Sequence, residues 1–388
     1  MARNNIMDDV KACIAGRVSK APLIFPLFEE FVARQAGVNY HDYSTRAPII
    51  AQVWAYAIEH FDTDWAGLFI DDLIEYDMLG IETADGPDHP YAVTKYLPAE
   101  KGALDHLHIP SPKKDGRMPM LLEAQKRIRD QWGDRVVISK SVAAPFSGLT
   151  LLYGINNTML MTCDAPDLLK KSMTFLEELA ITWGRALIEG GTDVFWLGDC
   201  SASSRFISLD MYREFAMEPA RRVISELQQA GGIVIYHAGE NRLPFLVETA
   251  KLGADILSVE GGIDLAEVKN TLGPHMALSG NLDGIKEIWQ SQPQDIEQRV
   301  RQLVRDVAIK GGVIVNTGEG IPEQTSVANV RAMIQGIRNA WPRGTHPVKK
   351  TANSTYRNFN VVAGVADPGP ASPRPATVVS CRRSNLTC

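Results

Sequence analysis

From about Asp64 to Trp341 the chain alternates short, uniformly apolar runs with longer segments that show helical periodicity. The apolar runs are rich in Val, Ile, Leu and Phe and do not alternate with polar residues, which is typical of strands buried on both faces. Such strands occur in parallel sheets that helices cover. The predicted strands are "DWAGLFI", "RVVISKSV", "DVFWLG", "GIVIYHA", "ADILSVEG", "HMALSGN" and "GVIVNTG".

Helices are predicted between these strands. Pro166 is expected to open a helix that Gly190 and Gly191 stop, and Ser208 and Ser326 can cap two more. Seven strands separated by helices are close to the eight of a (β/α)₈ TIM barrel. A doubly wound sheet would show the same alternation, but no G-x-G-x-x-G or G-x-x-x-x-G-K-[ST] phosphate loop follows any of the strands. The α/β barrel is therefore the predicted fold.

The segments outside this alternation are expected to be accessory to the barrel. The first sixty residues are largely helical in pattern and should cap or line it. Residues 84–119 are expected to form a long excursion near the barrel mouth. We predict a barrel domain with its N-terminal helices over residues 1–345, and a disordered tail rich in Pro, Ser and Ala over residues 346–388.

Charge and composition exclude several classes of partner. The formal net charge of −6 provides no general attraction to nucleic acid or to anionic lipid. No apolar run approaches the ~20 residues of a membrane helix, and the start "MARNNIMDD" does not resemble a signal peptide. The five cysteines form no C-x-x-C pair, which suits a reducing compartment. We expect a cytoplasmic protein that binds neither nucleic acid nor membrane.

Polar side chains follow almost every predicted strand, at the end where a barrel of this kind has its active site. These residues are Asp71, Asp72, Asp199, Cys200, His237, Glu240, Glu260, Asn281 and Glu319. Carboxylates gathered in a barrel mouth need partners, protons or a metal, so the pattern favours an enzyme over a structural protein. Taken singly, an aspartate here can be a helix cap, Cys200 an inert buried thiol, and Glu260 or Asn281 a loop anchor.

His237 is the strongest of these positions. In "GGIVIYHAGEN", Ile233, Ile235 and His237 share one face of the strand. Inward residues of a barrel pack in layers, and the uppermost layer opens on the active site. We therefore expect His237 to lie in the barrel mouth, with Glu240 close by in sequence and Glu319 approaching from another strand. An imidazole with carboxylates on adjacent strands can bind Zn²⁺ and keep one coordination position open.

Several motifs occur in the order and spacing of the uroporphyrinogen decarboxylase superfamily. They are "GLFIDDLIEYDMLG", "GDCSASSRFISLDMYREF", "IYHAGEN", "LSGNLDG" and "NTGEGIPEQTSVANV". The resemblance covers roughly Pro22 to Trp341 and implies a (β/α)₈ barrel, in agreement with the strand pattern. It also implies one of two activities: decarboxylation of a tetrapyrrole, or methyl transfer with a corrinoid protein or a thiol acceptor, as in methylcobalamin:coenzyme M enzymes.

The decarboxylase is the less favoured of the two. Its resemblance implies an arginine-rich loop that binds the many carboxylates of the substrate, but the stretch "ARQAGVNYHDY" keeps Arg34 and has Val38 in place of a second arginine. Asp71 aligns with the essential aspartate of the decarboxylase, whereas Glu319 stands where that family has a late histidine. Asp72 and the acidic residues after it would repel such a substrate.

The methyltransferase branch is the closer resemblance. Its members commonly bind zinc through an H-x-C pair and a later cysteine. His237 keeps the histidine, Gly239 occupies the first cysteine position, and Glu319 replaces the later cysteine. The resemblance therefore implies a zinc site of His237 and Glu319, completed by Glu240 or Cys200. An oxygen-rich site is better suited to polarising an ether or amine leaving group than to activating a thiol.

We therefore predict a zinc-dependent methyltransferase that moves a methyl group between a small methylated substrate and a corrinoid protein. Asp71 and Asn281 are predicted to orient the substrate in the barrel mouth. The corrinoid is expected on a partner protein, so no cofactor-binding residues are assigned to this chain. Uroporphyrinogen decarboxylation and a non-catalytic binding protein on the same barrel are the alternatives.

Overall fold

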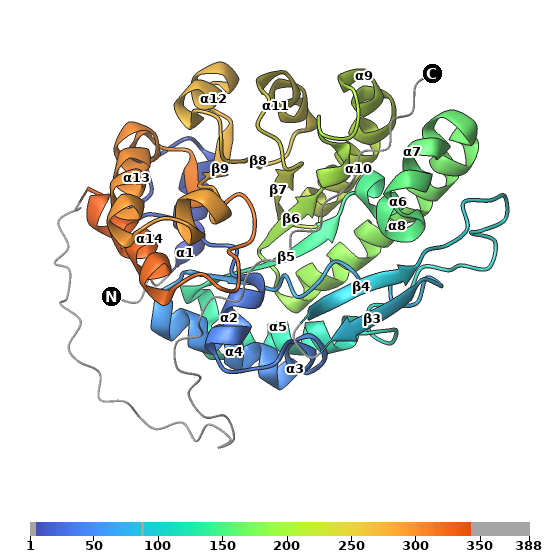
Figure 1. The fold of residues 1–388 in the computed structure, drawn as a ribbon, viewed down its shortest axis with the longest axis horizontal. Coiled ribbons are helices and arrows are strands. Elements are labelled where there is room, and N and C mark those ends of the chain that lie inside the picture. Colours follow the sequence, from blue (N-terminus) through green and yellow to red (C-terminus); the bar gives the residue numbers. More distant parts are fainter. Residues whose placement is uncertain (1–4, 87–88, 343–388) are drawn as a thin grey trace, which may run out of the picture. The chain divides into compact units, whose positions relative to one another are not determined.

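Eight parallel strands form the centre of the part of the chain that the computed structural model describes, residues 5–86 and 89–342. They are hydrogen-bonded in the order β1 (Ile24–Phe25), β10 (Val313–Asn316), β9 (Ala277–Asn281), β8 (Ile256–Val259), β7 (Ile233–His237), β6 (Val194–Gly198), β5 (Val137–Ala143) and β2 (Trp65–Gly67). The two ends of this row meet where Phe25 of β1 stacks on Trp65 of β2, with ring centroids 4.3 Å apart. The sheet is therefore a nearly closed barrel surrounded by helices (Figure 1), and the predicted (β/α)₈ fold is confirmed.

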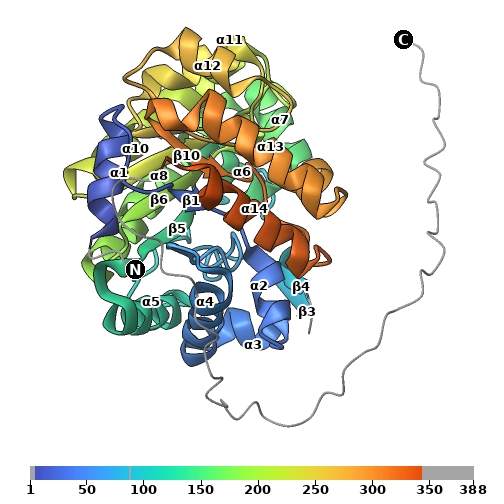
Figure 2. The same cartoon turned by 90° about the vertical axis from the view of Figure 1, so that its left-hand side faces the viewer.

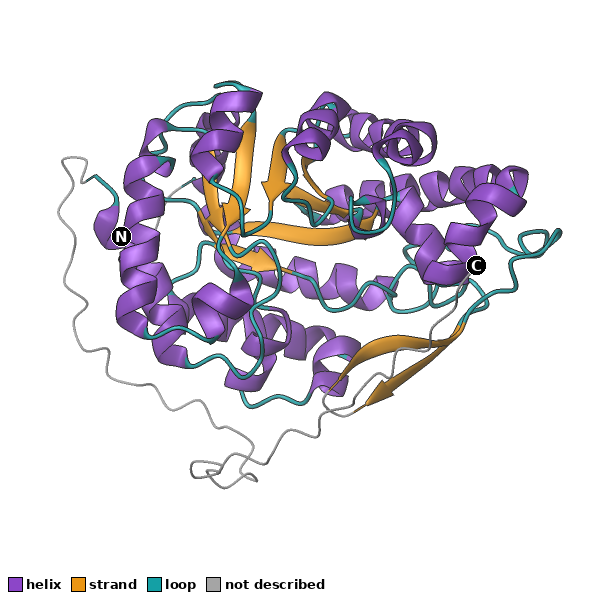
Figure 3. Cartoon of the chain, turned by 45° about the horizontal axis from the view of Figure 1, so that its top comes forward, coloured by secondary structure: helices purple, strands orange, loops and turns teal. Residues whose placement is uncertain are grey.

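Helices surround the central strands in Figure 3. The α-helices are α1 (Ile6–Ile14), α2 (Glu29–Gln35), α3 (Tyr40–Thr45), α4 (Ala47–Phe61), α5 (Met118–Trp132), α6 (Pro145–Tyr153), α7 (Ile155–Asp164), α8 (Pro166–Gly190), α9 (Leu209–Met211), α10 (Met217–Gln229), α11 (Leu243–Thr249), α12 (Leu265–Leu272), α13 (Pro293–Asp306) and α14 (Val327–Ala340). Short 3₁₀ turns lie at Gly133–Arg135, Cys200–Ala202, Ala250–Leu252 and Ala308–Lys310, and π-helical turns at Tyr212–Ala216 and Gly284–Trp289.

The helix ends lie where residue chemistry predicts them. Helix α8 begins at Pro166 and is followed by Gly191, whose φ of 103° is a left-handed conformation that ends the helix without strain. The side chains of Ser208 and Ser326 each accept a hydrogen bond from the backbone amide three residues later. The predicted caps are thus confirmed.

Strand β1 is the barrel strand that the sequence pattern does not reveal. It consists of Ile24 and Phe25, with Pro22 before it and Pro26 after it, in a stretch predicted to be helical. Two residues carry no periodicity, and the flanking prolines cannot donate to a ladder. Since β1 closes the row of strands, the residues that follow it lie at the barrel mouth, like those that follow every other strand.

The hydrophobic core has an inner and an outer layer. The inner layer fills the barrel with aromatic rings such as those of Phe25, Trp65 and Trp196, joined by aliphatic residues of the other strands. Helix α1 contributes Ile6 and Val10 to this inner layer and lies apart from α2, α3 and α4 in Figure 2. The outer layer packs the opposite strand faces against the helices.

The excursion predicted over residues 84–119 begins in an antiparallel hairpin. Its strands are β3 (Glu82–Gly86) and β4 (His89–Lys95), and the hairpin lies outside the barrel in Figures 1 and 3. Among the described residues, no helix combines the length and the apolar character needed to cross a membrane. The tail predicted over residues 346–388 lies outside the described residues.

Candidate functional site

Three side chains that can bind a metal converge at the carboxyl ends of the strands. His237 is the last residue of β7, Cys200 follows the end of β6, and Glu319 follows the end of β10. One ligand atom from each lies within 4.8 Å of the other two, and His237 Nε2 is 3.4 Å from Glu319 Oε1. Of the four metal ligands proposed from the sequence, the structure brings these three together.

The imidazole of His237 is held from two sides. Its Nδ1 lies 2.9 Å from the hydroxyl of Ser258 on β8. Its ring stacks on Trp196 of β6, with centroids 4.6 Å apart and an angle of 29° between the planes. Since Trp196 belongs to the inner layer of the barrel, His237 also lies on the inner side. Ser258 occupies Nδ1, so Nε2 is the atom that faces Glu319, an arrangement common among metal-binding histidines.

The charges around His237 favour a cation at this point. Burial alone would lower the pKa of His237, but its contacts with Cys200 and Glu319 raise that pKa to about 10. Burial would raise the pKa of Glu319, yet His237 holds it below its usual value. Burial, and then the hydrogen bond to Glu319, raise the pKa of Glu260 to about 7. A metal ion would supply the positive charge that a proton on the imidazole otherwise provides.

Gly239 faces the same point in space. A Cβ on this residue would lie 3.5 Å from Glu319 Oε1 and 3.6 Å from Cys200 Sγ. Its φ of 59° is a left-handed conformation, which glycine adopts readily. The position that the family resemblance assigns to a zinc cysteine therefore points into the cluster. Cys200 brings a thiol to this place from the neighbouring strand.

Asp199 fixes the turn that carries Cys200. Its carboxylate accepts hydrogen bonds from the hydroxyl of Tyr236 at 2.8 Å and from the backbone amide of Ser147 at 3.1 Å. Its backbone amide donates to the carbonyl of His237 at 2.6 Å. Burial raises the pKa of Asp199 to about 6. Asp199 thus anchors Cys200 beside His237 from within the protein.

Glu240 and Asn281 lie outside the cluster of three. The Glu240 carboxylate accepts hydrogen bonds from the backbone amides of Ser204, Asn241 and Arg242, at 2.8, 2.9 and 2.7 Å, and from the Ser204 hydroxyl at 3.1 Å. These hydrogen bonds give the Glu240 carboxylate a structural role in holding the loops. Asn281 donates to the carbonyl of Ile263 at 2.7 Å, and its Oδ1 is buried without a hydrogen-bond partner in the described part of the chain.

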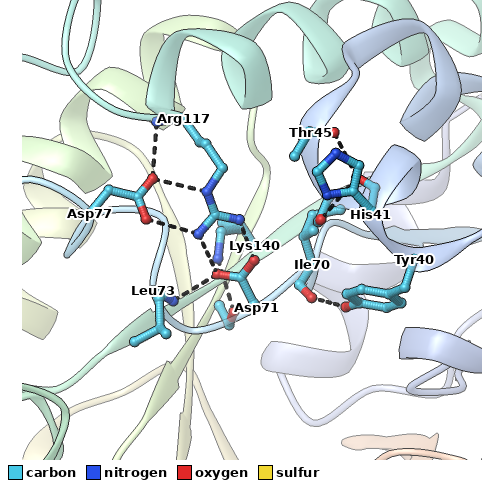
Figure 4. Close-up of polar contacts among 11 residues, drawn as sticks. Tyr40, His41, Thr45, Ile70, Asp71, Leu73, Asp77, Arg117 and Lys140 are labelled. Atoms are coloured by element: carbon cyan, nitrogen blue, oxygen red, sulfur yellow. Dashed lines mark hydrogen bonds and ion pairs between the residues drawn. The ribbon is translucent and has the colours of Figure 1, made fainter. Parts of the chain in front are cut away.

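Asp71, predicted to orient the substrate, is engaged by Arg117 (Figure 4). The guanidinium donates to both Asp71 oxygens, at 2.5 and 3.1 Å, and to both Asp77 oxygens, each at 2.9 Å. The backbone amide of Leu73 also donates to Asp71, at 2.9 Å, and the Asp71 side chain is 1% exposed. Sequence reasoning missed Arg117, because nothing in the excursion that carries it marks it as a partner of the β2 loop.

A cavity of about 310 Å³ lies between α2, the loop after β2 and strand β4. Its carboxylates include Glu29, Glu30 and Asp72. Of these, the sequence reasoning identified only Asp72, because the strand before Glu29 was not recognised. Both Glu29 and Asp72 are near enough to His237 and Glu319 for their charges to affect one another's pKa. The cavity and the cluster are therefore neighbours in the barrel mouth.

Comparison with known proteins gives a family and several relatives. The sequence model of the family "Uroporphyrinogen decarboxylase (URO-D)" matches residues 8–340. A methylated-thiol–coenzyme M methyltransferase of Methanosarcina mazei is 24% identical over 330 residues, which cover 84% of this chain and 87% of that protein. A methylcobamide:CoM methyltransferase of Methanosarcina barkeri is 26% identical and covers 56% of this chain and 62% of its own length.

Decarboxylases match at a similar level. The uroporphyrinogen decarboxylase of Methylobacillus flagellatus is 24% identical over 319 residues, covering 78% of this chain and 86% of that protein. Among solved structures, a methyltransferase from Methanosarcina mazei superimposes with a TM-score of 0.78 at 23% identity, over 87% of this chain and 99% of that one. The structural likeness establishes the fold, and the sequence relatives are enzymes of two kinds.

Proposed function

Because the chain belongs to the uroporphyrinogen decarboxylase (URO-D) family, whose members matched here include methyltransferases, we propose that it is a zinc-dependent methyltransferase. It would move a methyl group between a small methylated substrate and a corrinoid carried by a partner protein, in the direction of demethylation. The observation that carries this proposal is the convergence of Cys200, His237 and Glu319 at the barrel mouth. The corrinoid partner is inferred from relatives whose names include methylcobamide.

The three side chains fit a zinc ion in chemistry, and the His237–Glu319 pair also fits it in spacing. Nitrogen, sulfur and oxygen are all usual zinc ligands, and two ligands ~2.1 Å from a tetrahedral zinc ion lie about 3.4 Å apart. The distance between His237 Nε2 and Glu319 Oε1 is 3.4 Å. Three protein ligands leave a fourth position open, as in catalytic zinc sites. The heteroatom of the substrate would take that position.

Bound zinc would supply Lewis-acid polarisation of the heteroatom that loses its methyl group. The residues of the chain prepare the site for this. Ser258 and Trp196 fix the plane of the His237 ring, and the buried carboxylate of Asp199 fixes the turn of Cys200. In the transfer, the heteroatom keeps the electron pair of the broken bond, and the methyl acceptor supplies the pair for the new bond.

Tetrapyrrole decarboxylation has less support in this site. The residue that aligns with the essential aspartate of the decarboxylase, Asp71, has both carboxylate oxygens bonded to Arg117. A substrate with many carboxylates would also meet Glu29, Glu30 and Asp72 in the cavity. Like charges held close together in a protected mouth repel strongly.

Metal analysis of the purified full-length protein tests the proposal. We expect about one zinc ion per chain, lost in His237→Ala and retained in Cys163→Ser, whose thiol is exposed elsewhere. After replacement of zinc by Co²⁺, a sulfur-to-cobalt charge-transfer band should appear and disappear in Cys200→Ser. Protein without zinc above background, or zinc content unaffected by His237→Ala, would refute the metal assignment.

A second experiment tests the reaction itself. The protein is incubated with a reduced corrinoid protein and a panel of methyl ethers, thioethers and amines, and formation of methylcorrinoid is followed by absorbance. Turnover of one class supports the proposal. Stepwise loss of carboxylates from uroporphyrinogen would establish the decarboxylase instead. Tight substrate binding without turnover would favour a binding protein.

A further inference from the structure

The cavity beside the metal-binding cluster has the size and the position of a substrate pocket. Its volume of about 310 Å³ falls at the lower end of the ~300–1,000 Å³ range of small-ligand sites. It is bounded by residues after β1, by the loop after β2, by the outer hairpin and by α6. No lysine or arginine is among the residues that line it.

Two carboxylates in this cavity lack a direct partner, although the charges of Lys140 and His237 act on them from a distance. Asp71 is paired with Arg117, but the carboxylates of Glu29 and Asp72 form no hydrogen bond or ion pair with any described residue. Burial raises the pKa of Glu29, as do the charges of Glu30 and Asp72. Burial likewise raises the pKa of Asp72, and the nearby charge of Lys140 opposes this shift only in part. Carboxylates crowded in this way are stabilised by a cation placed between them.

Aromatic rings form much of the remaining wall. Tyr40, Phe69, Tyr91 and Tyr96 line the same cavity. Tyr91 already receives one cation, because the guanidinium of Arg117 lies 3.9 Å from the centroid of its ring. Aromatic faces attract ammonium groups, and most strongly those whose hydration is weak because methyl groups cover the nitrogen. Carboxylates and aromatic rings in one cavity therefore complement an organic cation better than a hydrated metal ion.

The cavity also leads to the cluster. Phe69 packs against Trp196 with ring centroids 6.2 Å apart, and Trp196 stacks on His237. On the other side, a Cβ on Gly320, the residue after Glu319, would collide with the Glu29 carboxylate. The rings of Phe69 and Trp196 thus connect the cavity wall to His237, and the Glu29 carboxylate lies beside the residue that follows Glu319.

We propose that this cavity binds an ammonium group, so that the substrate of the enzyme is a small methylated organic cation. The ammonium group would lie between Glu29 and Asp72 and against the aromatic rings, while the methylated heteroatom of the same molecule reaches the cluster. The role given to that heteroatom rests on the methyltransferase function proposed above. The recognition of the cation rests on the cavity alone.

Binding of a matched pair of probes tests this proposal on the full-length protein. Choline carries a trimethylammonium group, and 3,3-dimethylbutan-1-ol is its uncharged isostere. We expect choline to bind at least about tenfold more tightly in calorimetric titrations, because only the cation gains from the carboxylates and the ring faces. Equal affinity for the two probes, or no binding of either, would overturn the proposal.

Variants then locate the binding. Glu29→Gln, Asp72→Asn and Tyr96→Leu should each weaken choline binding about tenfold or less and leave the neutral probe unaffected. Glu189→Gln, which removes an exposed carboxylate on α8, is the control for net charge and should change neither affinity. Choline binding that survives both carboxylate substitutions would place the cation elsewhere and refute the site.

Thermal unfolding separates this role from a structural one. If Glu29 serves binding, Glu29→Gln should raise the melting temperature of the ligand-free protein, because it removes a carboxylate that burial and its acidic neighbours destabilise. A fall in melting temperature would indicate a structural role and count against the proposal. Zinc content distinguishes the two proposals: choline binding without zinc leaves the cation pocket standing and refutes the metal site alone.

Discussion

The Arg117 bridge gives a prediction whose size can be worked out from the structure. In Arg117→Met the methionine fills much of the same volume, but the carboxylates of Asp71 and Asp77, which are 1% and 16% exposed, lose their partner. Breaking a buried ion pair on one side costs about 3–5 kcal/mol of unfolding free energy. We therefore expect a loss of about 3–5 kcal/mol at pH 7.

The double variant Arg117→Met/Asp71→Asn isolates this effect. It replaces the stranded charge with a neutral amide, so at least about 2 kcal/mol of the loss should be recovered. Urea unfolding, followed by tryptophan fluorescence, measures all of these differences.

Arg127→Met is the matched control on α5, the helix that begins directly after Arg117. Arg127 pairs with Glu123 at 2.6 Å, but both side chains are about half exposed, at 49% and 54%. Such a surface pair contributes about 0.3–0.5 kcal/mol. If Arg117→Met costs no more than Arg127→Met, or if the double variant recovers nothing, the buried bridge does not stabilise the loop after β2 in the way described.

Three further predictions concern the cluster and its surroundings. Gly239→Cys should place a second thiol at the cluster and slow the removal of zinc by a chelator, whereas Gly239→Ala should not. If the rate of zinc removal is unchanged in both variants, the Cβ of residue 239 does not point into the cluster. Ser258→Ala should weaken zinc binding about tenfold with the fold intact, because it removes the hydrogen-bond partner of His237 Nδ1. An unchanged zinc affinity in a competition titration would argue against this role of Ser258. Burial raises the pKa of Glu75 to about 7. Between its ordinary pKa of ~4.3 and about pH 7, the folded chain therefore keeps a proton on Glu75 that the unfolded chain loses. The stability of the protein consequently falls as the pH rises from ~4.3 to about 7. Glu75→Gln should therefore stabilise the protein by on the order of 2 kcal/mol at pH 8 and hardly at all at pH 4.5, as measured by urea unfolding; an equal effect at both values would exclude this titration.

The fold and half of the site could be predicted because both depend on local pattern. Long apolar strands and helix caps depend on residues that are consecutive in the sequence. In a parallel barrel, the last residue of a strand lies at the mouth whichever strands it pairs with. The alternation in β7 therefore directs attention to His237, and the strand-end rule to Cys200 and Glu319. Strand β1 escapes detection because its two residues, Ile24 and Phe25, are too few to show a period. Glu29 and Glu30 escape with it.

The remainder depends on contacts between segments far apart in the chain. Asp71 has the expected position after β2, yet its environment is decided by Arg117, which lies 46 residues later. Glu240 follows His237 closely, but its carboxylate turns to the backbone of its own loop and to Ser204. Sequence spacing fixes where the backbone of these residues runs. It does not fix which atoms the side chains meet.

The placement of Cys200 beside Gly239 bears on how a site of this kind can change in evolution. Gly198 of β6 is in register with His237 of β7, so the residues just beyond the two strands reach one common point. If the cluster binds the proposed zinc ion, a thiol lost from one strand can therefore be replaced by a thiol from its neighbour at the same point. Aligned position by position, such a chain has lost a ligand. Superimposed in space, it has kept the donor atom and changed only the strand that delivers it.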